Sequence, residues 1–144
     1  MMNSEWKFVH VGMVVKDLEK TVERLRTLGL ISTPARETLT LKGKAPDQTE
    51  NAGQILMREV TCAGLCIELL QPLSGDNLQQ RWLNAHGEGI SHVCYEVPDI
   101  AKARDQMTAQ GVAVLCHIRD STTYYETGEP GSLQIELRQS EGPV

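Results

Sequence analysis

The sequence predicts an α+β fold in which two βαβββ modules in tandem form a cupped, barrel-like mixed sheet. The first observation is a repeat, because the pattern of residues 10–18 (HVGMVVKDL) returns 82 positions later as residues 92–100 (HVCYEVPDI). A second repeat relates residues 67–71 (IELLQ) to residues 135–139 (IELRQ), 68 positions later. In both copies a strand pattern leads directly into a helix pattern. Internal duplication of this kind indicates two copies of one structural unit.

The first module begins with a strand and a helix. Residues 6–15 are rich in valine and alternate loosely, which predicts a strand. Asp17 is a typical helix N-cap, and Gly29 lies where a C-terminal cap is expected. Between them, apolar residues recur at helical spacing: Leu18, Val22 and Leu25.

Three strands complete this module. Residues 36–42 form a weak strand pattern, and residues 54–61 and 64–72 form a hairpin that turns near Ala63 and Gly64. The intervening residues 43–53 are polar and contain proline and glycine. We expect them to form a surface loop, which would be suited to covering a site.

The second module repeats this plan after a short helical linker that runs from residue 74 to about residue 85. A strand over 90–97 precedes Asp99 as N-cap, and Gly111 ends the helix. Three further strands are expected, with residues 128–131 (GEPG) as a turn: 112–118, 122–127 and 132–139. We therefore expect residues 1–144 to form one domain of two modules, about 6–73 and 88–140.

Composition indicates an ordinary globular domain and argues against several classes of partner. The 144 residues are 40% hydrophobic and 23% charged, and the net charge of −5 argues against nucleic acid. No apolar run approaches the roughly 20 residues of a membrane span, and no apolar signal segment opens the chain. Four cysteines without a Cys-x-x-Cys pair predict buried thiols and a cytoplasmic location: Cys62, Cys66, Cys94 and Cys116.

Each module carries one histidine and one glutamate at repeated positions, His10 with Glu68 and His92 with Glu136. A carboxylate inside an apolar strand is costly to bury unless it is paired or binds a metal. Strand alternation could instead point either glutamate to water. The duplication favours convergence of all four side chains in the hollow of the sheet. Mixed imidazole and carboxylate ligation suits one divalent ion of Mn, Fe, Co, Ni or Zn.

Around these positions the chain resembles the vicinal oxygen chelate superfamily, which includes glyoxalases, bleomycin-resistance proteins and dioxygenases. Residues 10–18 and 87–100 carry the superfamily pattern. Within it, residues 67–73, 82–92 and 135–137 are most similar to methylmalonyl-CoA epimerase. The resemblance implies a metal ligand at each of four positions: His10, Glu68, His92 and Glu136.

The resemblance also implies a metal-dependent isomerase or lyase that stabilises a chelated enolate, with Glu136 as the catalytic acid or base. Its substrate would be a small molecule, either an acyl-CoA thioester or a glutathione adduct. Some epimerases carry a second carboxylate for the other face of the substrate, and the nearest candidates here are Gln54 and Glu59. Relatives of this kind are often homodimers.

Three other functions remain open at this point. A glyoxalase I-like lactoylglutathione lyase needs nearly the same ligands. An extradiol dioxygenase uses two histidines and one glutamate on Fe(II), so Glu68 as a fourth ligand argues against it. A non-catalytic protein that sequesters an antibiotic would share the fold but generally lacks the ligand set.

Overall fold

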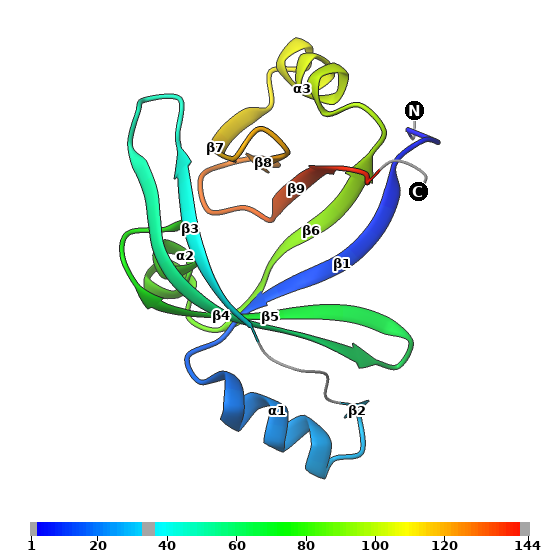
Figure 1. The fold of residues 1–144 in the computed structure, drawn as a ribbon, viewed down its shortest axis with the longest axis vertical. Helices are drawn as coiled ribbons and strands as arrows, with labels where there is room; N and C mark the ends of the chain where they lie inside the picture. The colour runs from blue at the N-terminus through cyan, green and yellow to red at the C-terminus, as the bar shows by residue number, and fades with distance from the viewer. Residues whose placement is uncertain (1–2, 33–36, 142–144) are drawn as a thin grey trace.

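The computed structural model, shown in Figure 1, describes residues 3–32 and 37–141. The first module consists of β1 (Lys7–Val14), α1 (Leu18–Thr27), β2 (Ile31–Ser32), β3 (Glu37–Lys44), β4 (Glu50–Cys62) and β5 (Leu65–Ser74). The linker helix is α2 (Leu78–His86), and the second module consists of β6 (Gly89–Val97), α3 (Ile100–Ala109), β7 (Ala113–Ile118), β8 (Thr122–Glu126) and β9 (Gln134–Gln139). The predicted fold class is confirmed, and the short strand β2 is an addition to it. None of these helices is long and apolar enough to cross a membrane.

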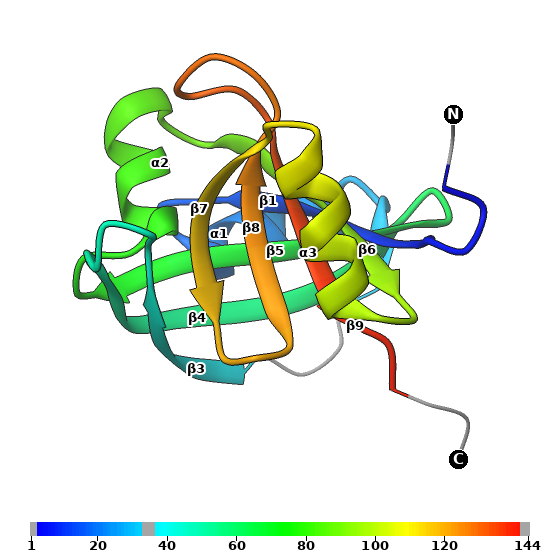
Figure 2. The same ribbon diagram turned by 90° about the horizontal axis from the view of Figure 1, so that it is seen from above.

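All nine strands belong to one mixed sheet, in the order β2-β4-β3-β7-β8-β9-β6-β1-β5. A further pairing of β4 with β5 closes the sheet into a barrel, which Figure 2 shows from above. The modules meet at two seams, where β1 pairs antiparallel with β6 and β3 pairs antiparallel with β7. The barrel therefore encloses one shared hollow between the two modules.

The β1–β6 seam preserves the 82-residue repeat as a pseudo-two-fold relation. His10 is the register partner of Cys94, and Gly12 is the register partner of His92. On the outer sides of this pair, Gly12 lies opposite Glu68 in β5, and Cys94 lies opposite Glu136 in β9. The duplicated residues therefore lie on four neighbouring strands.

The helices α1 and α3 cover the outside of the barrel, each over its own module (Figure 1). Their N-caps are as predicted, because the Asp17 and Asp99 carboxylates accept hydrogen bonds from the backbone N–H groups of Lys20 and Lys102, each over 3.0 Å. The helices bury two apolar clusters against the sheet: Val15, Leu18, Val22, Val60 and Leu69 in the first module, and Val97, Ala103, Met107, Tyr125 and Leu137 in the second. This packing leaves the inner face of the sheet free to form a site.

The prediction of a surface loop at residues 43–53 is wrong over most of its length. Strand β3 runs on to Lys44 and β4 already begins at Glu50, so that only the turn between them lies outside the ladder. Gly53 permits this long hairpin to approach β5, since it has a φ of +121° and a Cβ there would lie 1.9 Å from the Ser74 carbonyl oxygen. Of the expected strand 36–42, residue 36 lies outside the described residues.

The cysteines are only partly as predicted. All four are free thiols, but Cys94 and Cys116 alone are buried. Cys62 and Cys66 are half-buried because they flank the tight turn at the end of the β4–β5 hairpin, where the strands extend beyond the core.

Asn77 joins the linker to the first module, and its replacement by alanine should be costly. The fully buried side chain caps α2 by accepting a hydrogen bond from Gln80 N–H over 2.9 Å and donates to the carbonyls of Ala52 and Ser74 over 3.2 Å. Loss of a cap costs about 1 kcal/mol, and the orphaned carbonyls should raise the total to about 2 kcal/mol. Urea unfolding of Asn77→Ala measures this loss. Asn84→Ala, on an exposed turn of the same helix, is the control, and equal losses in both variants would contradict the assignment.

Candidate metal centre

The four repeated residues converge at one point inside the barrel. His10 comes from β1, Glu68 from β5, His92 from β6 and Glu136 from β9, so four adjacent strands each supply one side chain. One nitrogen or oxygen atom from each residue lies within 4.8 Å of the corresponding atom of every other. Both histidines are almost fully buried, and both glutamates are less than a tenth exposed. The alternative in which strand alternation points the glutamates to water does not apply.

The spacing of these atoms suits a single bound ion. The Nε2 atoms of His10 and His92 are 3.2 Å apart, and Glu136 Oε2 lies 3.4 Å from the first and 3.1 Å from the second. Glu68 Oε1 is 3.6 Å and 3.8 Å from the same two nitrogens. Ligand bonds of about 2.1 Å would place neighbouring donors about 3.0 Å apart in an octahedron and about 3.4 Å apart in a tetrahedron. The donor set and its spacing therefore fit a divalent cation.

Charge in the cluster leads to the same conclusion. Burial, and then the nearby Glu136 carboxylate, raise the pKa of Glu68 to about 7. Burial alone would also raise the pKa of Glu136, but the adjacent imidazoles of His10 and His92 hold that pKa well below its usual range. The Glu136 Oε2 atom nevertheless accepts no hydrogen bond of good geometry. Two confined carboxylates with an unsatisfied oxygen create a site that a cation would stabilise.

The backbone of the β1–β6 seam aims the two histidines at this point. A β-bulge inserts Val9 into β1 directly before His10, and a second bulge inserts Ser91 into β6 directly before His92. The bulges are related by the same 82-residue repeat. Gly12 makes room for the imidazole of His92, because a Cβ at Gly12 would lie 1.9 Å from the ring carbon Cε1.

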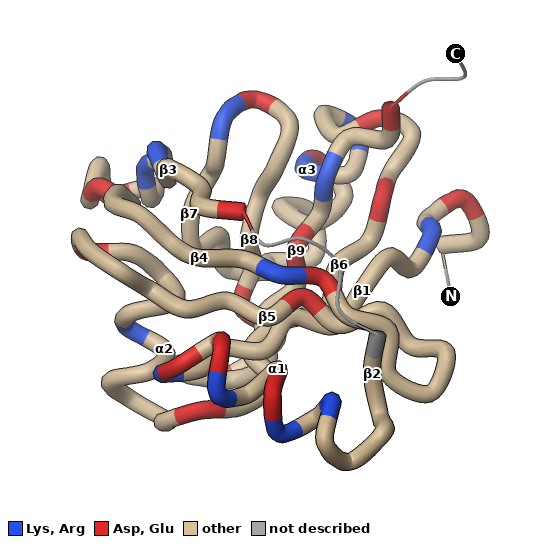
Figure 3. Tube along the Cα trace, turned by 60° about the horizontal axis from the view of Figure 1, so that its bottom comes forward, with Lys and Arg blue, Asp and Glu red and all other residues tan. Residues whose placement is uncertain are grey.

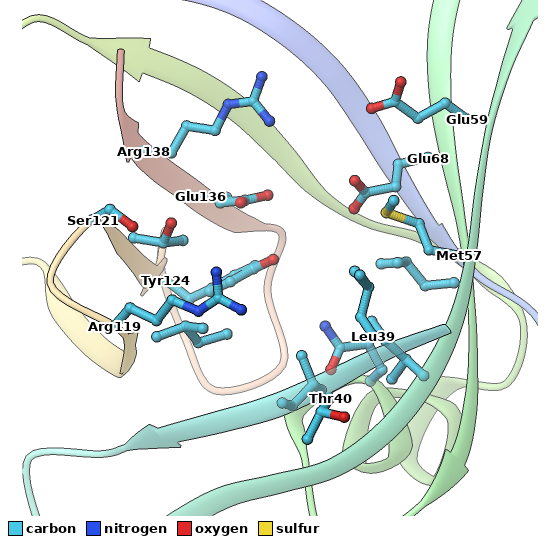
Figure 4. Close-up of a pocket in the computed structure, with 16 residues that line it drawn as sticks. Leu39, Thr40, Met57, Glu59, Glu68, Arg119, Ser121, Tyr124, Glu136 and Arg138 are labelled. Atoms are coloured by element: carbon cyan, nitrogen blue, oxygen red, sulfur yellow. The ribbon is translucent and has the colours of Figure 1, made fainter. Parts of the chain in front are cut away.

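Glu68 and Glu136 open onto a cavity of about 330 Å³ between the two modules (Figure 4). One wall comes from β3, β4 and β5, and the other from β7, β8 and β9. The first wall is largely apolar, with Leu39, Leu41, Ile55, Met57 and Leu70. The second wall is largely polar, with Arg119, Ser121, Thr122, Tyr124 and Arg138. The cavity can thus hold a molecule with both a polar and an apolar part next to the cluster.

The structure separates the two candidates for a second acid or base. Glu59 lies directly opposite Glu68 in the β4–β5 register and lines the cavity (Figure 4). Gln54 is exposed and does not line the cavity. It lies beside a register shift between Gln54 and Ile55. Glu59 is therefore the candidate that the structure brings to the site.

Other residues were not singled out from the sequence. Arg138 follows Glu136 by two positions in β9, so strand alternation could have placed it on the same face, and it donates to Glu96 over 2.9 Å. Tyr124 packs edge-on against the His92 ring, at 5.4 Å between ring centroids. Arg119 reaches the cavity from the β7–β8 turn with a φ of +57°, which no sequence pattern announces.

The remaining histidines and the surface charges lie apart from the cluster. His86 is exposed and stacks on Trp82, while His117 Nδ1 lies 2.9 Å from Thr123 Oγ1. In Figure 3 basic and acidic residues are interspersed along the trace. The concentrated chemistry of the molecule is therefore in the barrel.

Comparison with known proteins identifies the family. Residues 9–125 match the glyoxalase/bleomycin resistance protein/dioxygenase superfamily. The chain belongs to this superfamily. It is 33% identical over 107 residues to the ethylmalonyl-CoA/methylmalonyl-CoA epimerase of Cereibacter sphaeroides, an alignment that covers 74% of this chain and 72% of the relative. The predicted superfamily and the similarity to methylmalonyl-CoA epimerase are confirmed.

Solved structures show the same superfamily fold. A hypothetical protein from Bacillus halodurans superposes with a TM-score of 0.70 at 18% identity, over 96% of this chain and 97% of that one. Methylmalonyl-CoA epimerase from Mycobacterium tuberculosis gives 0.64 at 20% identity, over 93% and 87%. The Streptomyces coelicolor methylmalonyl-CoA epimerase in complex with 2-nitronate-propionyl-CoA gives 0.64 at 22% identity, over 94% and 95%.

Proposed function

We propose that this superfamily member is a metal-dependent epimerase of an acyl-CoA thioester that carries a carboxylate on its α-carbon, such as methylmalonyl-CoA. The observation that supports this most directly is the buried cluster of two histidines and two glutamates at the end of a mixed polar and apolar cavity. The relative with 33% identity, which is named as an epimerase of ethylmalonyl-CoA and methylmalonyl-CoA, supports the choice of substrate class.

In this proposal His10, Glu68, His92 and Glu136 hold one divalent ion. When bound, the ion supplies a Lewis acid that stabilises negative charge on substrate oxygens. The two imidazoles ligate through Nε2, the atoms that face each other across 3.2 Å. Burial of all four side chains keeps bulk water out of the cluster and strengthens its electrostatic interactions.

Epimerisation requires a proton to leave one face of the α-carbon and another to arrive on the opposite face. Glu136 on β9 and Glu59 on β4 stand on facing walls of the cavity (Figure 4). We assign Glu136 to one face, since its low pKa keeps it ionised and able to accept a proton. Glu59 serves the other face. The apolar side chains of Leu39, Ile55 and Met57 receive the α-alkyl group of the substrate.

The test is hydrogen exchange at the α-carbon. Purified protein, stripped of metal and reloaded with Co²⁺ or Zn²⁺, is incubated with methylmalonyl-CoA in deuterated water, and deuterium at C2 is followed by mass spectrometry. We expect exchange that depends on the added metal and stops with a chelator. A metal-replete protein without exchange above the buffer rate would contradict the proposed function.

A parallel incubation with the hemithioacetal of methylglyoxal and glutathione separates the epimerase from its main alternative. Formation of lactoylglutathione, without exchange at C2 of methylmalonyl-CoA, would assign the protein to glyoxalase chemistry instead. Metal content of the purified protein is a further check, because a sequestering protein of the same fold need not hold a metal.

A further inference from the structure

The two histidines of the cluster are supported differently on the sides that face away from it. His92 Nδ1 lies 3.3 Å from the hydroxyl oxygen of Ser91, and that oxygen lies 3.5 Å from the carbonyl oxygen of Gly12. His10 Nδ1 is also buried, but it has no hydrogen-bond partner among the described residues. The pseudo-symmetry of the site is therefore broken one atom away from the ligands.

The difference comes from a single side chain at equivalent backbone positions. Ser91 and Val9 are the two bulge residues of the β1–β6 seam, 82 positions apart, and each directly precedes its histidine. Ser91 is 2% exposed, so its hydroxyl needs partners within the protein. Val9 at the matching place has no polar side-chain atom to offer His10.

Ligand chemistry explains what the Ser91 hydroxyl does. A neutral imidazole that binds a metal through Nε2 carries its proton on Nδ1, and a hydrogen bond from Nδ1–H sets that tautomer and the orientation of the ring. Here His92 Nδ1–H donates to Ser91 Oγ, and the Ser91 hydroxyl donates to the Gly12 carbonyl. Each donor in this short chain then has an acceptor.

Packing alone does not fix the same property. The His92 ring lies above Gly12 and edge-on to Tyr124, which restricts its plane. A half-turn of the ring about its own bond would keep that plane and exchange the positions of Nδ1 and a ring carbon. The bond to Ser91 distinguishes these two orientations, because only one of them places a nitrogen beside the hydroxyl.

We propose that Ser91 is a positioning residue that locks His92 with Nε2 toward the cluster, and that it thereby sets the affinity of the site for its divalent ion. This inference rests on the metal-binding part of the proposed function. His10 has no such side-chain support, so His92 is the more strongly oriented of the two imidazole ligands.

The experiment measures metal binding rather than turnover. Apo-protein is titrated with Co²⁺ or Zn²⁺ alone against a chromophoric chelator. We expect Ser91→Ala to weaken affinity by about 10- to 100-fold, the usual effect of losing the hydrogen-bond partner of a metal ligand. Ser91→Thr retains the hydroxyl and should restore most of the affinity. Val9→Ala is the matched control and should leave affinity within about twofold of the parent.

Proton NMR of the Co²⁺-loaded protein supplies a signature that a merely structural role would not give. We expect one shifted, exchangeable Nδ1–H resonance to exchange slowly with water in the parent and Ser91→Thr proteins, and quickly in Ser91→Ala. Equal affinity of Ser91→Ala and parent would overturn the proposal. So would a Ser91→Thr variant that binds as weakly as Ser91→Ala, since the hydroxyl would then not be responsible.

The outcomes also separate this inference from the proposed reaction. Metal binding that depends on Ser91, in a protein without exchange at C2 of methylmalonyl-CoA, would support the positioning role and contradict the epimerase. Metal binding and exchange that are both unaffected in Ser91→Ala would do the reverse. A parent protein that binds neither metal would overturn both.

Discussion

Replacement of Glu136 with glutamine is expected to slow hydrogen exchange at the α-carbon of methylmalonyl-CoA by about 10²- to 10⁴-fold, the range lost with a general acid or base. The variant keeps the shape of the side chain but removes the carboxylate that lies 3.1 Å from His92 Nε2 and faces the cavity. The amide oxygen is also a weaker ligand than a carboxylate. Exchange should therefore be measured across a range of metal concentrations, up to saturation.

The control for this variant is Glu129→Gln, which makes the same chemical change at an exposed position in the β8–β9 turn. It should exchange deuterium at the parent rate. If saturating metal restored full exchange to Glu136→Gln, the residue would be a ligand only, and the proton transfer would have to be assigned to another side chain.

The duplication made most of the site predictable from the sequence. Because His10 and His92 begin equivalent strands and Glu68 and Glu136 end equivalent modules, pairing of the modules about a two-fold relation brings all four together. The helix caps Asp17 and Asp99 were predictable for a local reason, since a cap depends on its own hydrogen bond to the following turn.

Other features depend on contacts that composition does not encode. Residues 43–53 have the polar and glycine-bearing composition of a loop, yet the β3–β4 ladder and the approach of Gly53 to Ser74 hold much of this segment in strands. The choice between Glu59 and Gln54 likewise required the register shift at Gln54, which a period-two count along β4 cannot reveal. The asymmetry between Ser91 and Val9 became meaningful only when both proved to be bulge residues.

Gly12→Ala is expected to disable the cluster without touching a ligand. The added Cβ would lie 1.9 Å from Cε1, 2.2 Å from Nδ1 and 2.4 Å from Nε2 of His92, so the whole imidazole has to move. His92 is 1% exposed, and the surrounding packing leaves it no free space. We expect metal affinity to fall by at least about 100-fold, the upper end of what loss of a ligand's hydrogen-bond partner costs. Isothermal titration of the apo-protein with Zn²⁺ measures this effect.

Gly89→Ala is the matched control at the start of β6, because no atom lies within 4 Å of a Cβ there and its φ lies outside the left-handed region. It should bind metal like the parent. Overpacking at Gly12 should also cost about 1–3 kcal/mol of folding free energy, so urea unfolding of both apo-proteins is needed beside the titration. A folded Gly12→Ala protein with parental affinity would show that His92 can leave its position without loss of the ion. The assignment of His92 as a ligand would then fail, although His10, Glu68 and Glu136 would keep their places in the barrel.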